Sequence, residues 1–370
     1  MTDFHGIIFA YNGSPDLQAL VNDRTAASLP VGGRYRLIDF ALSSLRNAGI
    51  TDCGIIMQRD YQSLLDHIGS GKSWDMSKKS GGLRMLPPFG LPEYHKGNYS
   101  GTIEALNAVY TYIQEIKQSH VILMVGSLFA NIDLACAIRA HMQSGAEITA
   151  VCAETAPAAK THKYIRGDSG FAERILFERE AEDEGLSSLE CYIVSKKLLL
   201  QMMDRCRSLD QYRFHRDAIA RYLSDGGRIN LYIHKGYASF VKSVEAYYKV
   251  NTDLLNSDVR RQLFPADRPV RTRAVEEVST YYGENALSRN SLVADNCIIE
   301  GSIENCVIFS GVRIQKGAKL KNCIIMKGSV IKEWSELSYV ISDKFCTFSP
   351  GITLTGSPNL PIVVPKNSAI

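Results

Sequence analysis

Residues 6–40 read GIIFAYNGSPDLQALVNDRTAASLPVGGRYRLIDF, and this stretch decides the fold of the first part of the chain. It opens with an apolar run from Gly6 to Ala10, which turn-forming residues follow. Such a run is typical of a strand buried on both faces of a parallel sheet. From Leu37 to Asn47, apolar side chains then recur at helical spacing, which predicts an amphipathic helix. Strand, loop and helix in this order favour an α/β domain.

The alternation of strand and helix patterns continues to residue 255. Apolar runs predict further strands at residues 53–57, 121–125, 147–153, 174–177, 191–194 and 229–234, and helical spacing predicts helices at 61–68, 102–116, 134–142, 214–223 and 244–255. Residues 69–101 contain Gly, Pro, Ser and Lys without a sustained period, which is usual for a binding loop or a mobile lid. These patterns predict a doubly wound, Rossmann-like domain over residues 1–258.

A different period begins after a predicted linker at residues 259–285. The tetrapeptide Asn-Cys-[Ile/Val]-Ile occurs at residues 296–299, 305–308 and 322–325, and apolar residues recur at intervals of mostly five or six. A repeat near six residues, interspersed with glycines, predicts a left-handed parallel β-helix of hexapeptide repeats over residues 286–370. A meander of antiparallel strands is the alternative, but it predicts alternation at every second residue, which fits less well.

Composition and charge exclude several classes of function. The chain has 42 Lys and Arg against 39 Asp and Glu, a formal charge of +3, so we expect neither a nucleic-acid partner nor a membrane surface. Nine cysteines without a CxxC spacing indicate packed core positions rather than disulfides or metal ligands. We find neither a signal-peptide pattern nor an apolar run of membrane-spanning length, and we expect a cytoplasmic protein.

Several motifs, in the right order, resemble those of one enzyme family. Residues 29–43, LPVGGRYRLIDFALS, are similar to the pattern KPAVPFGGKYRIIDFALSN of the ADP-glucose pyrophosphorylases, the nucleotidyltransferases that make ADP-glucose for glycogen and starch. Residues 98–106 resemble the family's WYxGTADAV segment, residues 121–133 its strand ending in GDH, and residues 236–251 its GYWxDVGTIESYYxAN segment. The resemblance covers nearly the whole chain. It implies a nucleotidyltransferase domain followed by a β-helix.

The same resemblance places unusual residues at the family's phosphate-binding positions. Two adjacent glycines fall on Tyr11 and Asn12, a third on Ser14, an arginine on Asp16, and the lysine before PAVP on Ala26. A tyrosine side chain obstructs a triphosphate where the backbone must approach it closely. An acid in place of a cation repels phosphate by about 1 to 4 kcal/mol at contact distance.

Two further departures concern the aspartates of GDH and DVGT. They fall on Ser127 and Phe240, and the glycine of DVGT falls on Lys242. Phosphoryl chemistry of this kind relies on positioning and on metal ions, and Mg²⁺ prefers hard carboxylate oxygens. The resemblance therefore implies that no catalytic residue and no metal site remain, and that Mg²⁺ is needed only at a partner catalytic subunit.

Three arginines remain as candidates for binding an anionic effector. The family places cationic effector contacts near Arg24 and Arg36, and Arg34 lies in the same preserved stretch. The alternative is that these arginines are solvated or salt-bridged. The basic residues of the long loop, Lys72, Lys78, Lys79, His95 and Lys96, are interpreted as solvated charges.

The resemblance is strongest to the family's regulatory, non-catalytic subunits. It implies a subunit that assembles with the catalytic subunit into a hetero-oligomer, for which we expect a tetramer, and that modulates synthesis of ADP-glucose from ATP and glucose 1-phosphate, with a sugar phosphate as a possible effector. One alternative is an active glucose-1-phosphate adenylyltransferase with a rewired site. Another is a hexapeptide-repeat acyltransferase, but that chemistry needs a histidine in the coils, and the sequence has none beyond His234.

Overall fold

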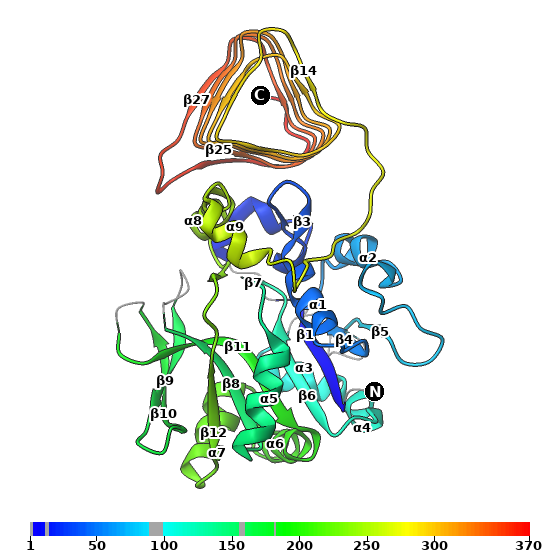
Figure 1. Cartoon of the computed structure of the whole chain (residues 1–370), viewed down its shortest axis with the longest axis vertical. Helices are drawn as coiled ribbons and strands as arrows, with labels where there is room; N and C mark the ends of the chain where they lie inside the picture. The colour runs from blue at the N-terminus through cyan, green and yellow to red at the C-terminus, as the bar shows by residue number, and fades with distance from the viewer. Residues whose placement is uncertain (1–2, 12–14, 89–98, 155–159, 181–182) are drawn as a thin grey trace.

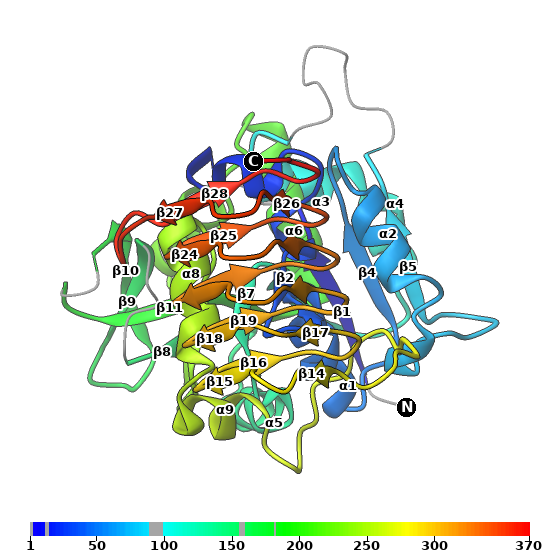
Figure 2. The same cartoon turned by 90° about the horizontal axis from the view of Figure 1, so that it is seen from above.

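An α/β domain and a triangular prism of stacked coils follow one another along the chain (Figure 1). The computed structural model describes residues 3–11, 15–88, 99–154, 160–180 and 183–370. Asn12, Ser14, His95 and Lys96 lie outside the described residues. The prism lies against one end of the α/β domain, and the coils stack side by side when the molecule is turned (Figure 2).

A nine-stranded sheet forms the centre of the first domain. The first strand, β1, runs parallel to β4 and to β6, whereas β11 is antiparallel to β6 and β8. Every residue of β1 is buried, as its apolar run predicts. The strands are β1 (Phe4–Phe9), β4 (Cys53–Ile56), β5 (Leu83–Leu86), β6 (His120–Val125), β8 (Ile148–Ala153), β9 (Thr161–Arg166), β10 (Ala172–Arg179), β11 (Leu186–Ser195) and β12 (Ile229–Ile233).

Helices cover both faces of this sheet, which confirms the doubly wound fold. Adjacent residues of β1 point to opposite faces, so that Ile8 packs with Leu42 of α1, and Ile7 packs with Leu106 of α3. None of the described helices is long and apolar enough to span a membrane. The helices are α1 (Leu37–Asn47), α2 (Gln62–Ile68), α3 (Thr102–Ala108), α4 (Tyr110–Glu115), α5 (Leu134–Ser144), α6 (Lys196–Ser208), α7 (Ala220–Ser224), α8 (Val244–Asp253) and α9 (Ser257–Leu263).

Two local predictions need correction, and one helix was not predicted. Residues 69–101 contain a short helix, η3 (Lys72–Trp74), and strand β5, which pairs with β4 at the edge of the sheet. The predicted helix at 214–223 begins as a π-helix, η5 (Phe214–Ile219), before it continues as α7. Helix α6 was not predicted, although Leu199, Met203 and its other buried side chains recur at helical spacing.

The second domain is the predicted left-handed β-helix. Three sheets of five parallel strands form its sides, so the antiparallel meander is excluded. Cys297, Cys306, Cys323 and Cys346 are buried in its core as free thiols, as predicted. The strands are β14 (Tyr281–Tyr282), β17 (Ile298–Ile299), β20 (Arg313–Ile314), β23 (Val330–Ile331) and β26 (Thr347–Phe348) on one side, β15 (Leu287–Arg289), β18 (Ser302–Glu304), β21 (Lys319–Lys321), β24 (Glu336–Ser338) and β27 (Thr353–Thr355) on the second, and β16 (Leu292–Val293), β19 (Val307–Ile308), β22 (Ile324–Ile325), β25 (Val340–Ser342) and β28 (Ile362–Val364) on the third.

The two domains share a hydrophobic core. Phe309, Ile324 and Ile341 of the β-helix pack in one cluster with Leu20 and Val244 of the first domain. Residues 264–280, called here the connecting segment, contain neither helix nor strand. Helix α9 runs past the predicted domain boundary at residue 258, and β14 lies within the range predicted as linker.

Candidate functional site

The two positions to which the resemblance assigns aspartates lie next to each other. Ser127 directly precedes β7 (Leu128–Ala130), which pairs with β13 (Ala238–Phe240). In this two-stranded ribbon Phe240 lies opposite Leu128, and the Val241 N–H donates to the Ser127 carbonyl over 3.3 Å. Ser127 also follows the carboxyl end of β6, the edge at which α/β sheets usually bind ligands.

The residues present at this place do not fit Mg²⁺. Phe240 has no exposed surface and belongs to the apolar cluster that includes Ile38 and Leu128. The Lys242 ammonium lies 4.5 Å from the centroid of the Phe240 ring, where a metal ion would instead need anionic ligands. A phenyl ring, a hydroxyl and a neighbouring cation cannot replace two carboxylates.

Tyr11 and Ala26 are also packed into apolar surroundings. Tyr11 follows β1, belongs to the cluster of Ile103, and has its ring centroid 5.4 Å from that of Tyr99. Burial raises the pKa of Tyr11 above its usual value, so the side chain stays a neutral phenol. Ala26 has no exposed surface. Asp16, in contrast, lies exposed in the first turn of η1 (Pro15–Val21).

A polar cluster that the sequence did not reveal lies close to Phe240. Lys242 forms an ion pair of 3.7 Å with Glu190, and the imidazole rings of His162 and His215 lie 4.0 Å apart. Burial would raise the pKa of Glu190, but the nearby Lys242 ammonium, followed by the imidazoles of His215 and His162, outweighs burial and lowers it. Burial lowers the pKa of His215 to about 3, so this imidazole is neutral at pH 7. The surroundings of Phe240 therefore contain one charge pair, Lys242 with Glu190.

The structure separates the three predicted effector arginines. Arg24 forms a buried ion pair with Asp343 of the β-helix, with 4 % and 1 % of the two side chains exposed. Its guanidinium also lies 3.9 Å from the sulfur of Met326. Arg24 is therefore a bridge between the two domains, whereas Arg34 and Arg36 line a cavity.

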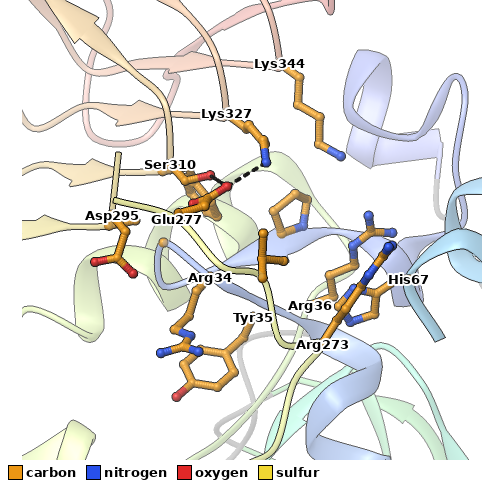
Figure 3. A pocket seen from close by; sticks show the side chains of 15 residues that line it. Arg34, Tyr35, Arg36, His67, Arg273, Glu277, Asp295, Ser310, Lys327 and Lys344 are labelled. Carbon is orange, nitrogen blue, oxygen red and sulfur yellow. Dashed lines mark hydrogen bonds and ion pairs between the residues drawn. The ribbon is translucent and has the colours of Figure 1, made fainter. Parts of the chain in front are cut away.

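That cavity, called here the basic pocket, lies between β3 (Tyr35–Arg36), the connecting segment and the β-helix (Figure 3). Its volume is about 330 Å³. Five cations and two carboxylates line it, an excess of three positive charges, which equals the formal charge of the whole chain. The charged lining residues are Arg34, Arg36, Arg273, Lys327, Lys344, Glu277 and Asp295.

Arg36 is held in place at the start of α1. Its guanidinium donates to the Ser63 carbonyl at 2.6 Å and to the Ser63 hydroxyl at 3.0 Å. Its backbone N–H donates to Asp39 at 2.9 Å, and the other Asp39 oxygen lies 2.6 Å from Nε2 of His67. These contacts position the guanidinium before any ligand binds.

The positive charge of the basic pocket is only partly compensated. Burial, followed by the charges of Arg36 and Arg24, lowers the pKa of Lys344 to about 8. Burial likewise lowers the pKa of Arg36 to about 10. Asp343 and Asp39 act in the opposite direction, but burial outweighs them in both cases. The pocket is therefore suited chemically to a small, multiply charged anion.

Sequence reasoning found only part of this pocket. It identified Arg34 and Arg36 but missed Arg273, Lys327 and Lys344, which lie in the connecting segment and at the corners of the coils. None of these three residues belongs to a motif of the family resemblance. The two lysines lie near β3 only because the β-helix packs on the first domain. Lys327 and Lys344 lie in turns of successive coils, and this repeat spacing is a signal that the sequence contains.

Comparisons with known proteins agree with the two-domain architecture. The nucleotidyl transferase family profile matches residues 16–257, and the profile of the GlmU-like C-terminal hexapeptide matches residues 275–358. The chain is 31 % identical to the glycogen biosynthesis protein GlgD of Bacillus subtilis over 98 % of the chain and 95 % of the relative. It is 32 % identical to the glucose-1-phosphate adenylyltransferase of Geobacillus stearothermophilus over 82 % of the chain and 80 % of that enzyme. For the enzyme of Clostridium botulinum (strain Alaska E43) the identity is 29 %, over 87 % of the chain and 84 % of that enzyme.

Proposed function

The chain belongs to the ADP-glucose pyrophosphorylase family, and from this premise we propose that it is a catalytically impaired, regulatory subunit. It assembles with a catalytic glucose-1-phosphate adenylyltransferase subunit in a hetero-oligomer, for which we expect a tetramer in the cytoplasm. In that complex it modulates the synthesis of ADP-glucose for glycogen.

One observation carries the catalytic part of the proposal. Phe240 is fully buried in the apolar core at a position where the resemblance expects a metal-binding aspartate, and Ser127 lies beside it. An isolated serine hydroxyl binds Mg²⁺ far more weakly than a pair of carboxylates does. The buried Tyr11 and Ala26 extend the same argument to the positions where the resemblance places phosphate-binding residues.

The basic pocket supports the regulatory part. Its excess of positive charge and its preorganised Arg36 suit a phosphorylated sugar, since phosphate accepts several charge-assisted hydrogen bonds at once. The pocket lies between the two domains, so an anion bound there contacts both of them. Such a ligand can bias the arrangement of the domains only through contacts that differ between two arrangements.

The decisive experiment compares the isolated protein with the mixed complex. Pyrophosphate release is measured with Mg²⁺, ATP and glucose 1-phosphate for this chain alone, for a catalytic subunit alone, and for the two co-expressed. We expect negligible turnover by this chain alone, and a changed maximal rate or apparent substrate affinity in the mixed complex. Turnover of the isolated chain within the usual enzymatic range, about 1 to 10³ per second, contradicts catalytic impairment. Failure to co-purify, with unchanged kinetics, contradicts the subunit proposal.

An active enzyme with a rewired site is the alternative. The Lys242–Glu190 pair is the feature that favours it, because it supplies one cation and one carboxylate beside Phe240. Activity of the isolated chain that disappears in Lys242→Met would support this alternative, and the same assay therefore distinguishes the two proposals.

A further inference from the structure

A carboxylate of the protein itself already occupies part of the basic pocket. Glu277, from the connecting segment, accepts a hydrogen bond from the Lys327 ammonium at 2.9 Å and another from the Ser310 hydroxyl at 3.2 Å (Figure 3). Only 15 % of the Glu277 side chain is exposed, compared with 47 % for Lys327. The carboxylate therefore makes contacts in the cavity that an anionic ligand would otherwise make.

The connecting segment is attached to the rest of the molecule on either side of Glu277. On its C-terminal side, the Thr280 hydroxyl donates to the Ala294 carbonyl at 2.6 Å, and the Asn296 N–H donates to the Val278 carbonyl at 2.7 Å. On its N-terminal side, Arg273 donates to the Asp66 carbonyl at 2.5 Å. Glu277 thus reaches Lys327 from a segment that is attached to both domains.

Two of the other cations of the pocket donate hydrogen bonds to neutral partners. Arg36 donates to Ser63, and Arg273 donates to a backbone carbonyl of α2. In Figure 3 both side chains lie on the opposite side of the cavity from Glu277. One carboxylate therefore compensates one lysine, while the rest of the positive charge remains available to a ligand.

We propose that Glu277 is an internal competitor for the anion site, and that a phosphate monoester dianion binds the pocket by displacing its carboxylate from Lys327. This inference rests on the proposed function, because it specifies how the effector site of the regulatory subunit is controlled. Displacement removes the ion pair between the connecting segment and the β-helix, so ligand binding loosens one attachment between the domains.

The competition selects the class of ligand. A monoanion such as acetate would replace the Glu277 carboxylate by another group of the same charge, so its binding gains little electrostatic energy. A phosphate monoester carries a charge of about −1.5 to −2 at neutral pH and three acceptor oxygens, which it can share among several cations. The pocket therefore favours phosphate esters over carboxylic acids.

Calorimetric titration of the full-length protein with inorganic phosphate tests this proposal. We expect Glu277→Gln to bind phosphate about tenfold more tightly than the unmodified protein, since it removes the competing charge and keeps the shape of the side chain. Glu276→Gln is the matched control, because Glu276 is the exposed neighbour and does not line the cavity. Asp295→Asn removes the other carboxylate of the lining, for which we expect a smaller effect.

A double variant shows whether the competition is for Lys327. In a Lys327→Gln background the gain from Glu277→Gln is expected to fall below twofold, because the contested ammonium is absent. Equal affinities of the unmodified protein and Glu277→Gln would overturn the competition and leave the effector site standing. Equal gains in phosphate affinity from all three acid-to-amide variants would mean that only the overall charge of the protein matters, and this result would also overturn the competition. Absence of phosphate binding in every variant would overturn the effector site as well.

Discussion

Arg24 and Arg36 show how differently two arginines that lie close together in the sequence are used. Arg36 faces the basic pocket, whereas Arg24 is buried against Asp343. No local pattern distinguishes them, because the partner of Arg24 is 319 residues away in the sequence. The structure brings two of the three predicted anion candidates, Arg34 and Arg36, to one cavity, and only the tertiary structure could show that Arg24 lies elsewhere.

The Arg24–Asp343 pair gives a prediction about stability. Arg24→Ala leaves Asp343 buried without a cation, and we expect a loss of about 3 to 5 kcal/mol in the free energy of unfolding. The double variant Arg24→Met with Asp343→Leu removes both charges, and we expect it to lose much less. Urea unfolding of the unmodified protein, of Arg24→Ala and of the double variant measures these free energies. Equal losses in the single and double variants would show that the ion pair itself is not what matters.

Lys344 gives a prediction about pH. Its pKa is lowered to about 8, so the ammonium is charged at pH 7 and largely neutral at pH 9. An anion binds the charged form, and we therefore expect sulfate affinity to fall as the pH rises from 7 to 9, with proton uptake near pH 8. Sulfate keeps its charge throughout this range. Calorimetry in buffers of different ionisation enthalpy measures the proton uptake, and Lys344→Met is expected to flatten the pH profile.

At the scale of elements, the coils place large side chains on a left-handed backbone. Trp334 and Phe345 have φ angles of 61° and 59°, and they occupy corners where the neighbouring coil has Gly317 and Gly328. A Cβ on Gly317 would lie 2.3 Å from the ring of Trp334. The glycine in one coil thus makes room for the aromatic side chain in the next.

We therefore predict that Gly317→Ala destabilises the β-helix. The substitution adds a steric clash with Trp334 to the cost of a left-handed alanine, which is about 1 to 3 kcal/mol. Gly145→Ala is the matched control, since Gly145 has a φ of 62° and no atom within 4 Å of the added Cβ. Thermal unfolding is expected to show a larger loss for Gly317→Ala. Equal losses would mean that Trp334 moves aside without cost.

Sequence periodicity predicted the long, regular elements well. Helix α1 was predicted with the bounds that it has, and the repeat near six residues predicted the β-helix. The short edge strand β5 was missed because residues 83–86 are only partly buried and lie between glycines and prolines. The π-helix could not be predicted, since apolar spacing over six residues does not distinguish it from an α-helix.

At the scale of the whole molecule, the basic pocket exists only because the β-helix packs on the first domain. Its lining includes residues of β3, of the connecting segment and of four successive coils. The sequence predicted both domains, but it could not predict their contact, because that depends on the apolar cluster shared by residues such as Phe309 and Val244.

This arrangement leads to a prediction for the mixed complex. Arg36→Ala removes a preorganised cation of the pocket. We therefore expect the effector concentration that gives half of the maximal response to rise at least about tenfold. Arg34→Ala is the comparison, for which we expect a smaller change, because Arg34 lines the pocket but is exposed and points away from Lys327 and Lys344 in Figure 3. Effector titrations of ADP-glucose synthesis measure both. Unchanged responses in both variants would place the effector elsewhere.

Phe240 has a consequence for how this chain can evolve. The side chain stands where the family resemblance places an acid, yet it belongs to the apolar core with Ile38 and Leu128. A single substitution by aspartate would bury a carboxylate in this apolar cluster and lower stability before any activity could be gained. Selection for folding alone is then enough to keep the phenylalanine at this position.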